Sequence, residues 1–161
     1  MLDAISPVDG RYRRHTAPLA PWMSELGLIH HRVEVEVEYF LALVAMPLPQ
    51  LADFPQDKVE ACRDIHRNFN EADAQWVKDK ERITNHDVKA VEYFVKDAME
   101  RLGVGAWKEF VHFGLTSQDV NNTAIPLSLK RATEQVVLPL LDALIADLAS
   151  LATEWKSVPM L

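Results

Sequence analysis

The sequence predicts an all-α protein: a helical N-terminal domain over residues 1–111, then the first long, kinked helix of a central helical bundle over residues 112–161. Two observations predict this fold class. Apolar residues recur three and four positions apart in every long segment, as on the buried face of an amphipathic helix. No pair of short alternating segments is joined by a hairpin turn. In addition, the apolar stripe of the last segment is too wide for one groove, which favours a bundle.

The composition excludes several classes of protein. Hydrophobic residues make up 48% and charged residues 25% of the 161 residues, as in soluble globular domains. The formal charge of −7 disfavours nucleic acid as a partner but allows an anionic small molecule. We expect no membrane partner, because no apolar run reaches the length of a bilayer span and the start lacks a signal pattern. The single cysteine, Cys62, fits a reducing, cytoplasmic location and the interior of a helix packing.

Residues 1–20 are rich in proline and are expected to form an irregular arm. Residues 10–15 of this arm concentrate cationic side chains beside an aromatic ring. One interpretation is a solvated basic patch. The other is an arm folded over an anionic ligand, with Arg11 supplying a planar fork for carboxylate or phosphate and Tyr12 supplying a hydroxyl.

Residues 24–46 are predicted to form a helix although part of the segment resembles a strand. Residues 33–38 alternate valine and glutamate, which is typical of a half-buried strand. The three-and-four spacing of apolar residues nevertheless continues for more than twenty residues, which is long for a strand. Pro47 and Pro49 end the segment.

Three shorter helices are expected next. Asp53 is an N-cap candidate for the first, and Gly103 stops the last. The second is strongly charged and turns only Ala74 and Val77 inward. The three helices are expected over residues 53–70, 71–82 and 87–102.

A capping box marks the start of the last helix. Thr116 is the predicted N-cap, and Asp119 lies three residues further on. Apolar periodicity then runs over residues 120–155. Pro126 and Pro139 each remove one helical hydrogen bond, so a kink is expected at Pro126, and either a kink or the start of a second helix at Pro139.

The same helix start has two interpretations. The first N–H groups of a helix have no internal partners and form its positive end, so Thr116 and Ser117 are candidates for binding a carboxylate or phosphate. The alternative is a cap without a ligand.

Histidines offer one further candidate and one exclusion. His86 stands between Asn85 and Asp87 at a helix start, where its imidazole either faces a pocket or only caps the helix. His30 and His31 are adjacent and point apart on a helix. We therefore expect no metal site.

Three separated stretches resemble one enzyme family. Residues 6–12 (Ser-Pro-Val-Asp-Gly-Arg-Tyr), 84–94 (Thr-Asn-His-Asp-Val-Lys-Ala-Val-Glu-Tyr-Phe) and 112–119 (His-Phe-Gly-Leu-Thr-Ser-Gln-Asp) occur in the order found in the adenylosuccinate lyase branch of the fumarase/aspartase superfamily. The resemblance covers essentially the whole chain, but implies only the first third of such a lyase.

The resemblance implies a reaction and a division of roles. Members of this branch eliminate fumarate from adenylosuccinate to give AMP, and from succinyl-aminoimidazole-carboxamide ribonucleotide, without metal or cofactor and as homotetramers. By resemblance, His86 assists the general acid, while the principal acid and base lie beyond Leu161. The residues that would bind substrate are Arg11, Tyr12, Asn85, His86, Asp87, His112, Thr116 and Ser117.

Alternatives remain at this point. Another lyase of the superfamily, such as argininosuccinate lyase or fumarase, lacks the Gly-Arg-Tyr and Asn-His-Asp stretches in this form. A non-enzymatic helical interaction module would explain the apolar stripe over residues 136–157, which we expect to drive association. As a fragment without the proton-transfer pair, the chain is expected to be inactive.

Overall fold

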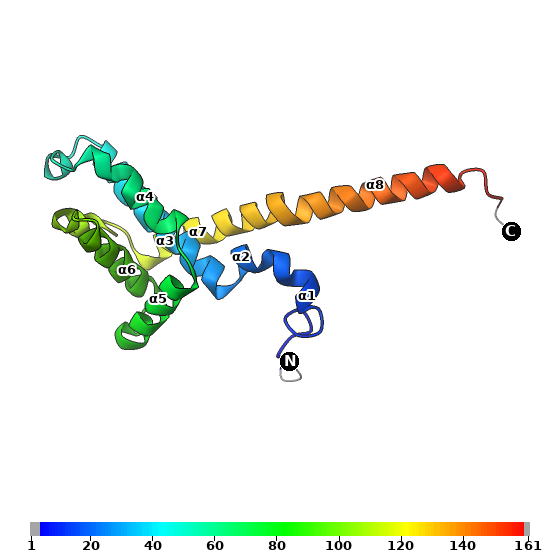
Figure 1. Ribbon diagram of the computed structural model, residues 1–161, viewed down its shortest axis with the longest axis horizontal. Coiled ribbons are helices and arrows are strands. Elements are labelled where there is room, and N and C mark those ends of the chain that lie inside the picture. Colours follow the sequence, from blue (N-terminus) through cyan, green and yellow to red (C-terminus); the bar gives the residue numbers. More distant parts are fainter. Residues whose placement is uncertain (1–3, 160–161) are drawn as a thin grey trace.

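The computed structural model describes residues 4–159, and no strand occurs among them. The all-α prediction is confirmed. Figure 1 shows a packed group of helices, from which one long rod projects to the C-terminus while a short arm leads to the N-terminus. The helices are α1 (Arg13–Thr16), η1 (Ala17–Leu19), α2 (Ala20–Met23), α3 (Glu25–Ala45), η2 (Pro49–Leu51), η3 (Gln56–Lys58), α4 (Val59–Arg67), α5 (Glu71–Thr84), α6 (Asp87–Arg101), η4 (Gly105–Phe110), α7 (Ser117–Ala132), η5 (Thr133–Val137) and α8 (Leu138–Trp155).

α3 is the central element of the packed group. The valine–glutamate alternation lies within this helix, as its length predicted. Ser24 caps it, its Oγ accepting a hydrogen bond of 3.1 Å from the Gly27 N–H. α3 contacts α2, α4, α5, α6 and α7. Its innermost residues belong to one apolar core, with Ile29, Val33, Val37 and Phe40 at most 2% exposed.

α4 is shorter than the sequence predicted, and Asp53 does not cap it. The helix begins at Val59 after the 3₁₀ turn η3, and its N-cap residue, Lys58, makes no side-chain capping bond. Pro55 holds an extended conformation, and Phe54 before it is only 2% exposed, in edge contact with Phe40. Burial of Phe54 therefore keeps this segment from joining the helix. The predicted burial of Cys62 is confirmed, since it is 1% exposed.

α5 and α6 agree closely with the prediction. Ala74 and Val77 are the buried residues of α5. α6 ends at Arg101, and Gly103 follows with a φ of +78°, a left-handed conformation that glycine adopts without strain. The inward residues predicted for α6, namely Val88, Val91, Phe94, Val95 and Met99, are all buried.

The last third of the chain forms one continuous rod of α7, η5 and α8 (Figure 1). The helix starts after Thr116, as predicted, and contains Pro126 within α7. The expected interruption at Pro139 takes the form of the π-helical turn η5, which ends at Val137, just before α8 begins at Leu138. α7 packs on α3, so the domain boundary between residues 111 and 112 stays a prediction.

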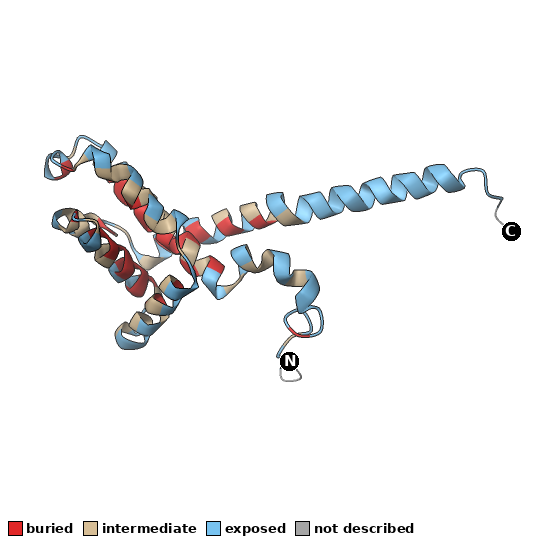
Figure 2. Cartoon of the chain, in the orientation of Figure 1, coloured by how far each residue is buried: buried red, intermediate tan, exposed pale blue. Residues whose placement is uncertain are grey.

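α8 has no buried residue, although all of it lies within the described part of the chain. Figure 2 shows it in the colour of exposed residues along its whole length. The rod from Ser117 to Trp155 also contains an 18-residue window with a mean hydropathy of 1.8, enough by length and composition to cross a membrane. The expectation that no apolar segment is long enough to span a bilayer is therefore wrong. The core helix of a soluble bundle passes the same test, so this finding alone does not place the chain in a membrane.

Candidate functional site

The loop between η4 and α7 places His112 against a buried carboxylate. His112 has a φ of +62° and Gly114 a φ of +73°, so the chain turns sharply here. His112 Nδ1 lies 2.5 Å from Glu36 Oε1 of α3. Glu36 is fully buried, and Oε2 of its carboxylate has no hydrogen-bond partner within the described residues. Burial raises the pKa of Glu36, and the hydrogen bond with His112 only partly opposes this rise.

The N-cap of α7, Thr116, lies four residues after His112. The backbone N–H and the hydroxyl of Thr116 both donate to Asp119 Oδ2, at 2.8 and 2.7 Å, which confirms the capping box. These bonds, led by the backbone N–H, lower the pKa of Asp119, as does the nearby His112. The Thr116 hydroxyl is thus engaged within the protein. Ser117, half-buried in the first turn, is better placed to reach a ligand at this helix end.

His86 caps α6, as the simpler interpretation predicted. Asn85 ends α5 in the left-handed conformation with a φ of 52°. The Nδ1 atom of His86 accepts a hydrogen bond of 3.1 Å from the Lys89 N–H. This bond requires an unprotonated Nδ1, so the neutral ring carries its proton on Nε2, and the exposed ring retains Nε2 as a donor for a substrate. A capping role and a substrate role are therefore compatible.

Asp87 is bound to a buried arginine of α3. Its Oδ2 lies 2.8 Å from Arg32 Nη2, and Arg32 Nε donates to Asn121 Oδ1 of α7 at 2.9 Å. The Arg32 side chain is 7% exposed. This network fixes the start of α6, which carries His86, against the first turns of α7, which carry Ser117. The direct contact of Asp87 is thus with the protein.

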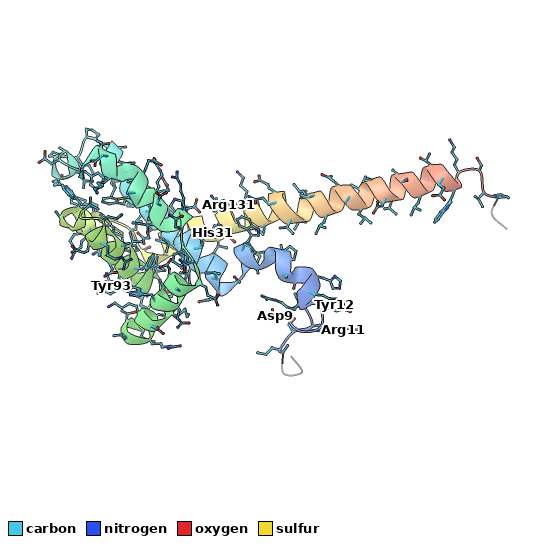
Figure 3. The ribbon with its side chains drawn as sticks, in the orientation of Figure 1. Asp9, Arg11, Tyr12, His31, Tyr93 and Arg131 are labelled. Carbon is cyan, nitrogen blue, oxygen red and sulfur yellow. The ribbon has the colours of Figure 1, made fainter. Side chains whose placement is uncertain are left out.

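The structure does not bring all predicted residues together. Figure 3 shows Arg11 and Tyr12 on the N-terminal arm, well apart from Tyr93 on α6. Both side chains are exposed, and the Arg11 guanidinium stacks over the Tyr12 ring at 5.4 Å from its centroid. Within one chain the arm is separate from the α6–α7 site. Whether these residues bind substrate stays a prediction.

Sequence reasoning missed Arg32 and Glu36, the two buried charges that organise this site. A signal for Glu36 was present, because it falls on the same helical stripe as Val33 and Phe40, where only apolar residues are expected. Arg32 stands next to that stripe. A charged residue on the core face of a predicted helix should have been treated as the partner of another polar group.

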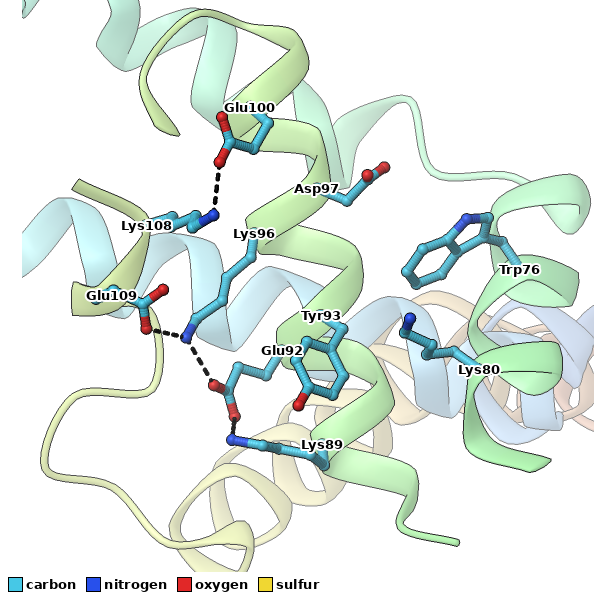
Figure 4. A pocket seen from close by; sticks show the side chains of 10 residues that line it. All are labelled: Trp76, Lys80, Lys89, Glu92, Tyr93, Lys96, Asp97, Glu100, Lys108 and Glu109. Carbon is cyan, nitrogen blue, oxygen red and sulfur yellow. Dashed lines mark hydrogen bonds and ion pairs between the residues drawn. The ribbon is translucent and has the colours of Figure 1, made fainter. Parts of the chain in front are cut away.

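A second polar hollow, of about 470 Å³, lies between α5, α6 and η4 (Figure 4). Lys96 bridges Glu92 and Glu109, with N–O distances of 3.0 and 2.6 Å. Lys89 binds Glu92 as well. Four lysines and four acidic residues line the hollow, so its formal charges cancel. Lys108 is paired with Glu100, and Lys80 lies over the Trp76 and Tyr93 rings. Because three of the four cations are paired with carboxylates, the hollow does not present an anion site.

Three potential metal ligands meet elsewhere, between α3 and α4. His30, Glu34 and His66 each offer a ligand atom, and these atoms all lie within 4.8 Å of one another. The expectation of no metal site rested on the adjacent His30–His31 pair, and His66 is too far from His30 in the sequence for spacing to reveal this group. His66 stands on α4, and only the packing of α4 on α3 brings it close.

Comparison with known proteins identifies the class. A family model described as lyase matches residues 10–161. The chain belongs to this lyase family.

Several relatives share a more particular name. The adenylosuccinate lyase of Dictyostelium discoideum is 47% identical over 165 residues, covering 99% of this chain and 35% of the relative. Those of Vibrio cholerae and Escherichia coli K12 are 43% and 41% identical, each covering 99% of this chain and 36% of the relative. The chain thus spans about a third of the length of the curated relatives it matches.

Proposed function

We propose that this chain is the N-terminal third of an adenylosuccinate lyase. The observation that carries the proposal is the similarity, at 36–47% identity over 99% of the chain, to proteins that bear this name. The complete enzyme eliminates fumarate from adenylosuccinate to give AMP, and from succinyl-aminoimidazole-carboxamide ribonucleotide, in purine biosynthesis. No nucleic acid or membrane enters this chemistry, and the enzyme acts in the cytoplasm.

The geometry around α7 supports this chemistry. In the elimination, a base removes the proton beside a carboxylate, negative charge accumulates there, and an acid protonates the leaving nitrogen. The start of α7, with Ser117 in its first turn, offers donors where that charge develops. His112, held by the buried Glu36, is a hydrogen-bonding group fixed beside this helix start. His86 assists the acid, while the principal acid and base are contributed by residues beyond Leu161.

The substrate site is completed by other subunits of a homotetramer. The arm with Arg11 and Tyr12 stands apart from the α6–α7 site of its own chain (Figure 3). In an assembly, such an arm can bring its guanidinium and hydroxyl to another subunit's site. The uncovered α8 supports the same assembly, because its exposed apolar residues need a partner surface.

The activity is tested with the complete reading frame that contains this chain. The full-length enzyme should convert adenylosuccinate to AMP and fumarate, followed by the loss of substrate absorbance. The 161-residue chain alone should show no turnover, because each missing general acid or base contributes roughly a hundred- to ten-thousand-fold. Turnover by the 161-residue chain, or none by the full-length enzyme, would refute the proposal.

Kinetics of variants in the full-length enzyme separate the roles. Arg11→Ala should mainly raise KM, because it removes a contact that stabilises the bound substrate and the transition state equally. Ser117→Ala and His86→Ala should mainly lower kcat, since their contacts strengthen as charge develops. Arg14→Ala, at an exposed arginine of the same arm, is the matched control and should change neither constant. A wild-type kcat in His86→Ala would show that His86 does not assist the acid.

A further inference from the structure

His30, Glu34 and His66 form a compact donor group outside the candidate site. His30 and Glu34 are four residues apart on α3, so their side chains project from the same face. His66 comes from α4, which packs on α3. The potential ligand atoms of the three side chains lie within 4.8 Å of one another, close enough to share one ion.

The chemistry of this donor set is selective. Two imidazoles and one carboxylate are the protein ligands of many zinc sites, and imidazole suits zinc, cobalt, nickel and copper better than magnesium or calcium. A second carboxylate stands beside the group, because Glu38 Oε1 lies 3.1 Å from His66 Nε2. Glu38 is in place either as a further ligand or as the acceptor that orients the ligated His66 ring.

The surroundings restrict the site as well. Packing fixes the His30 ring, which stacks on Phe69 with an interplanar angle of 5°. Both oxygens of Glu34 accept hydrogen bonds from Arg131 of α7, at 2.5 and 2.7 Å. An ionised carboxylate has about four lone-pair sites, so Glu34 can hold a metal ion and a guanidinium together. The positive charge of Arg131 nevertheless opposes a cation bound on the same carboxylate.

We propose that His30, Glu34 and His66 form a binding site for a divalent transition metal ion of the zinc class, which links α3 to α4. The site is independent of the proposed lyase activity. Metal binding at this site also competes with the Arg131–Glu34 ion pair that holds α7 to α3, because Arg131 and the metal ion share the Glu34 carboxylate. Figure 3 shows Arg131 on the rod where it meets the packed helices.

Titration of the chain with Co²⁺ and Zn²⁺ tests the proposal directly. One Co²⁺ per chain should bind, with visible d–d absorption, and Zn²⁺ should displace it. His30→Ala and His66→Ala should each weaken the affinity by at least the 10- to 100-fold, roughly, that loss of a supporting partner costs at a metal site. His15→Ala, at an exposed histidine of the arm, is the control and should leave the affinity unchanged.

A second variant keeps the proposal falsifiable if the histidine variants fold poorly. Arg131→Gln should tighten Co²⁺ binding by several-fold, since it removes the competing cation while retaining all three ligands. Circular dichroism on each variant checks that the helices persist. Absence of stoichiometric Co²⁺ binding overturns the proposal, and so does equal binding by the wild-type chain and the folded His30→Ala and His66→Ala variants. Unchanged or weaker binding by folded Arg131→Gln refutes the shared use of Glu34.

Discussion

α3 and α8 are amphipathic helices of similar length, 21 and 18 residues, but only one of them is covered. α3 buries ten residues among five neighbouring helices, whereas α8 buries none within its chain. Figure 2 shows the contrast as one helix marked by buried residues and another exposed throughout. Most of the stability of a protein helix comes from packing of its apolar face. The packed group therefore has the contacts to be stable by itself, and α8 depends on a partner.

The strongest test of this contrast compares two apolar truncations. Phe40→Ala in α3 should lower the free energy of unfolding by about 3–5 kcal/mol, because Phe40 is 1% exposed and removal of its ring leaves a cavity in the core. Leu144→Ala in α8, at a residue 54% exposed, should change it by no more than about 0.5 kcal/mol in dilute solution. Chemical denaturation measures both. A large loss in Leu144→Ala would mean that α8 is covered within its own chain.

Next in size is the ion pair that joins α6 to α3. Asp87→Asn should cost about 1–3 kcal/mol, because the Arg32 side chain, 7% exposed, loses its charged partner. Asp97→Asn is the control, since the Asp97–Arg101 pair is exposed and such pairs contribute less than about 1 kcal/mol. Equal effects of the two substitutions would argue against a special role for the buried arginine.

The Asp87 pair also predicts a pH dependence. Burial by itself raises the pKa of Asp87. The Val88 N–H and the Arg32 guanidinium together lower this pKa by more than burial raises it, so the net pKa is below its usual value. A lowered carboxyl pKa stabilises the fold above the ordinary aspartate pKa of about 4, and this stabilisation is lost as pH falls through the lowered value. The difference in unfolding free energy between wild type and Asp87→Asn should therefore shrink below about pH 4. A difference that stays constant in acid would contradict this cause.

The capping box of the rod gives the smallest effect. Thr116→Ala should lower the stability of the packed group by about 0.5–2 kcal/mol, because the α7 start loses the Thr116 hydroxyl bond to Asp119. Thr153→Ala near the end of α8 is the control. Its hydroxyl bonds only to the Ala149 carbonyl within the same helix, so its removal should leave unfolding of the packed group unchanged. Thermal unfolding followed by circular dichroism compares the two.

The sequence was sufficient for the features that depend on local pattern. The helices, the Thr116 capping box, the stop at Gly103 and the inward faces of α5 and α6 all follow from spacing and residue type. The error at Asp53 arose because burial of Phe54 outweighed a plausible cap.

Local sequence patterns could not predict contacts between residues that are far apart in the chain. Glu36 and His112 are 76 residues apart, and the Arg32–Asn121 bond spans 89 residues. Such pairs depend on which helices pack together, and periodicity alone does not specify that. The family resemblance supplied the candidate residues of the site, but not the buried charges that position them.

Amide hydrogen exchange of the 161-residue chain at several concentrations tests the contrast between α3 and α8 most directly. In dilute solution, α3 amides should exchange only through global unfolding, whereas α8 amides should exchange orders of magnitude faster. α8 should become protected as concentration rises, and a paired Leu144→Lys and Leu148→Lys variant should remove that gain. Protection of α8 equal to that of α3 at the lowest concentration, where the chain is monomeric by light scattering, would contradict the dependence of α8 on a partner.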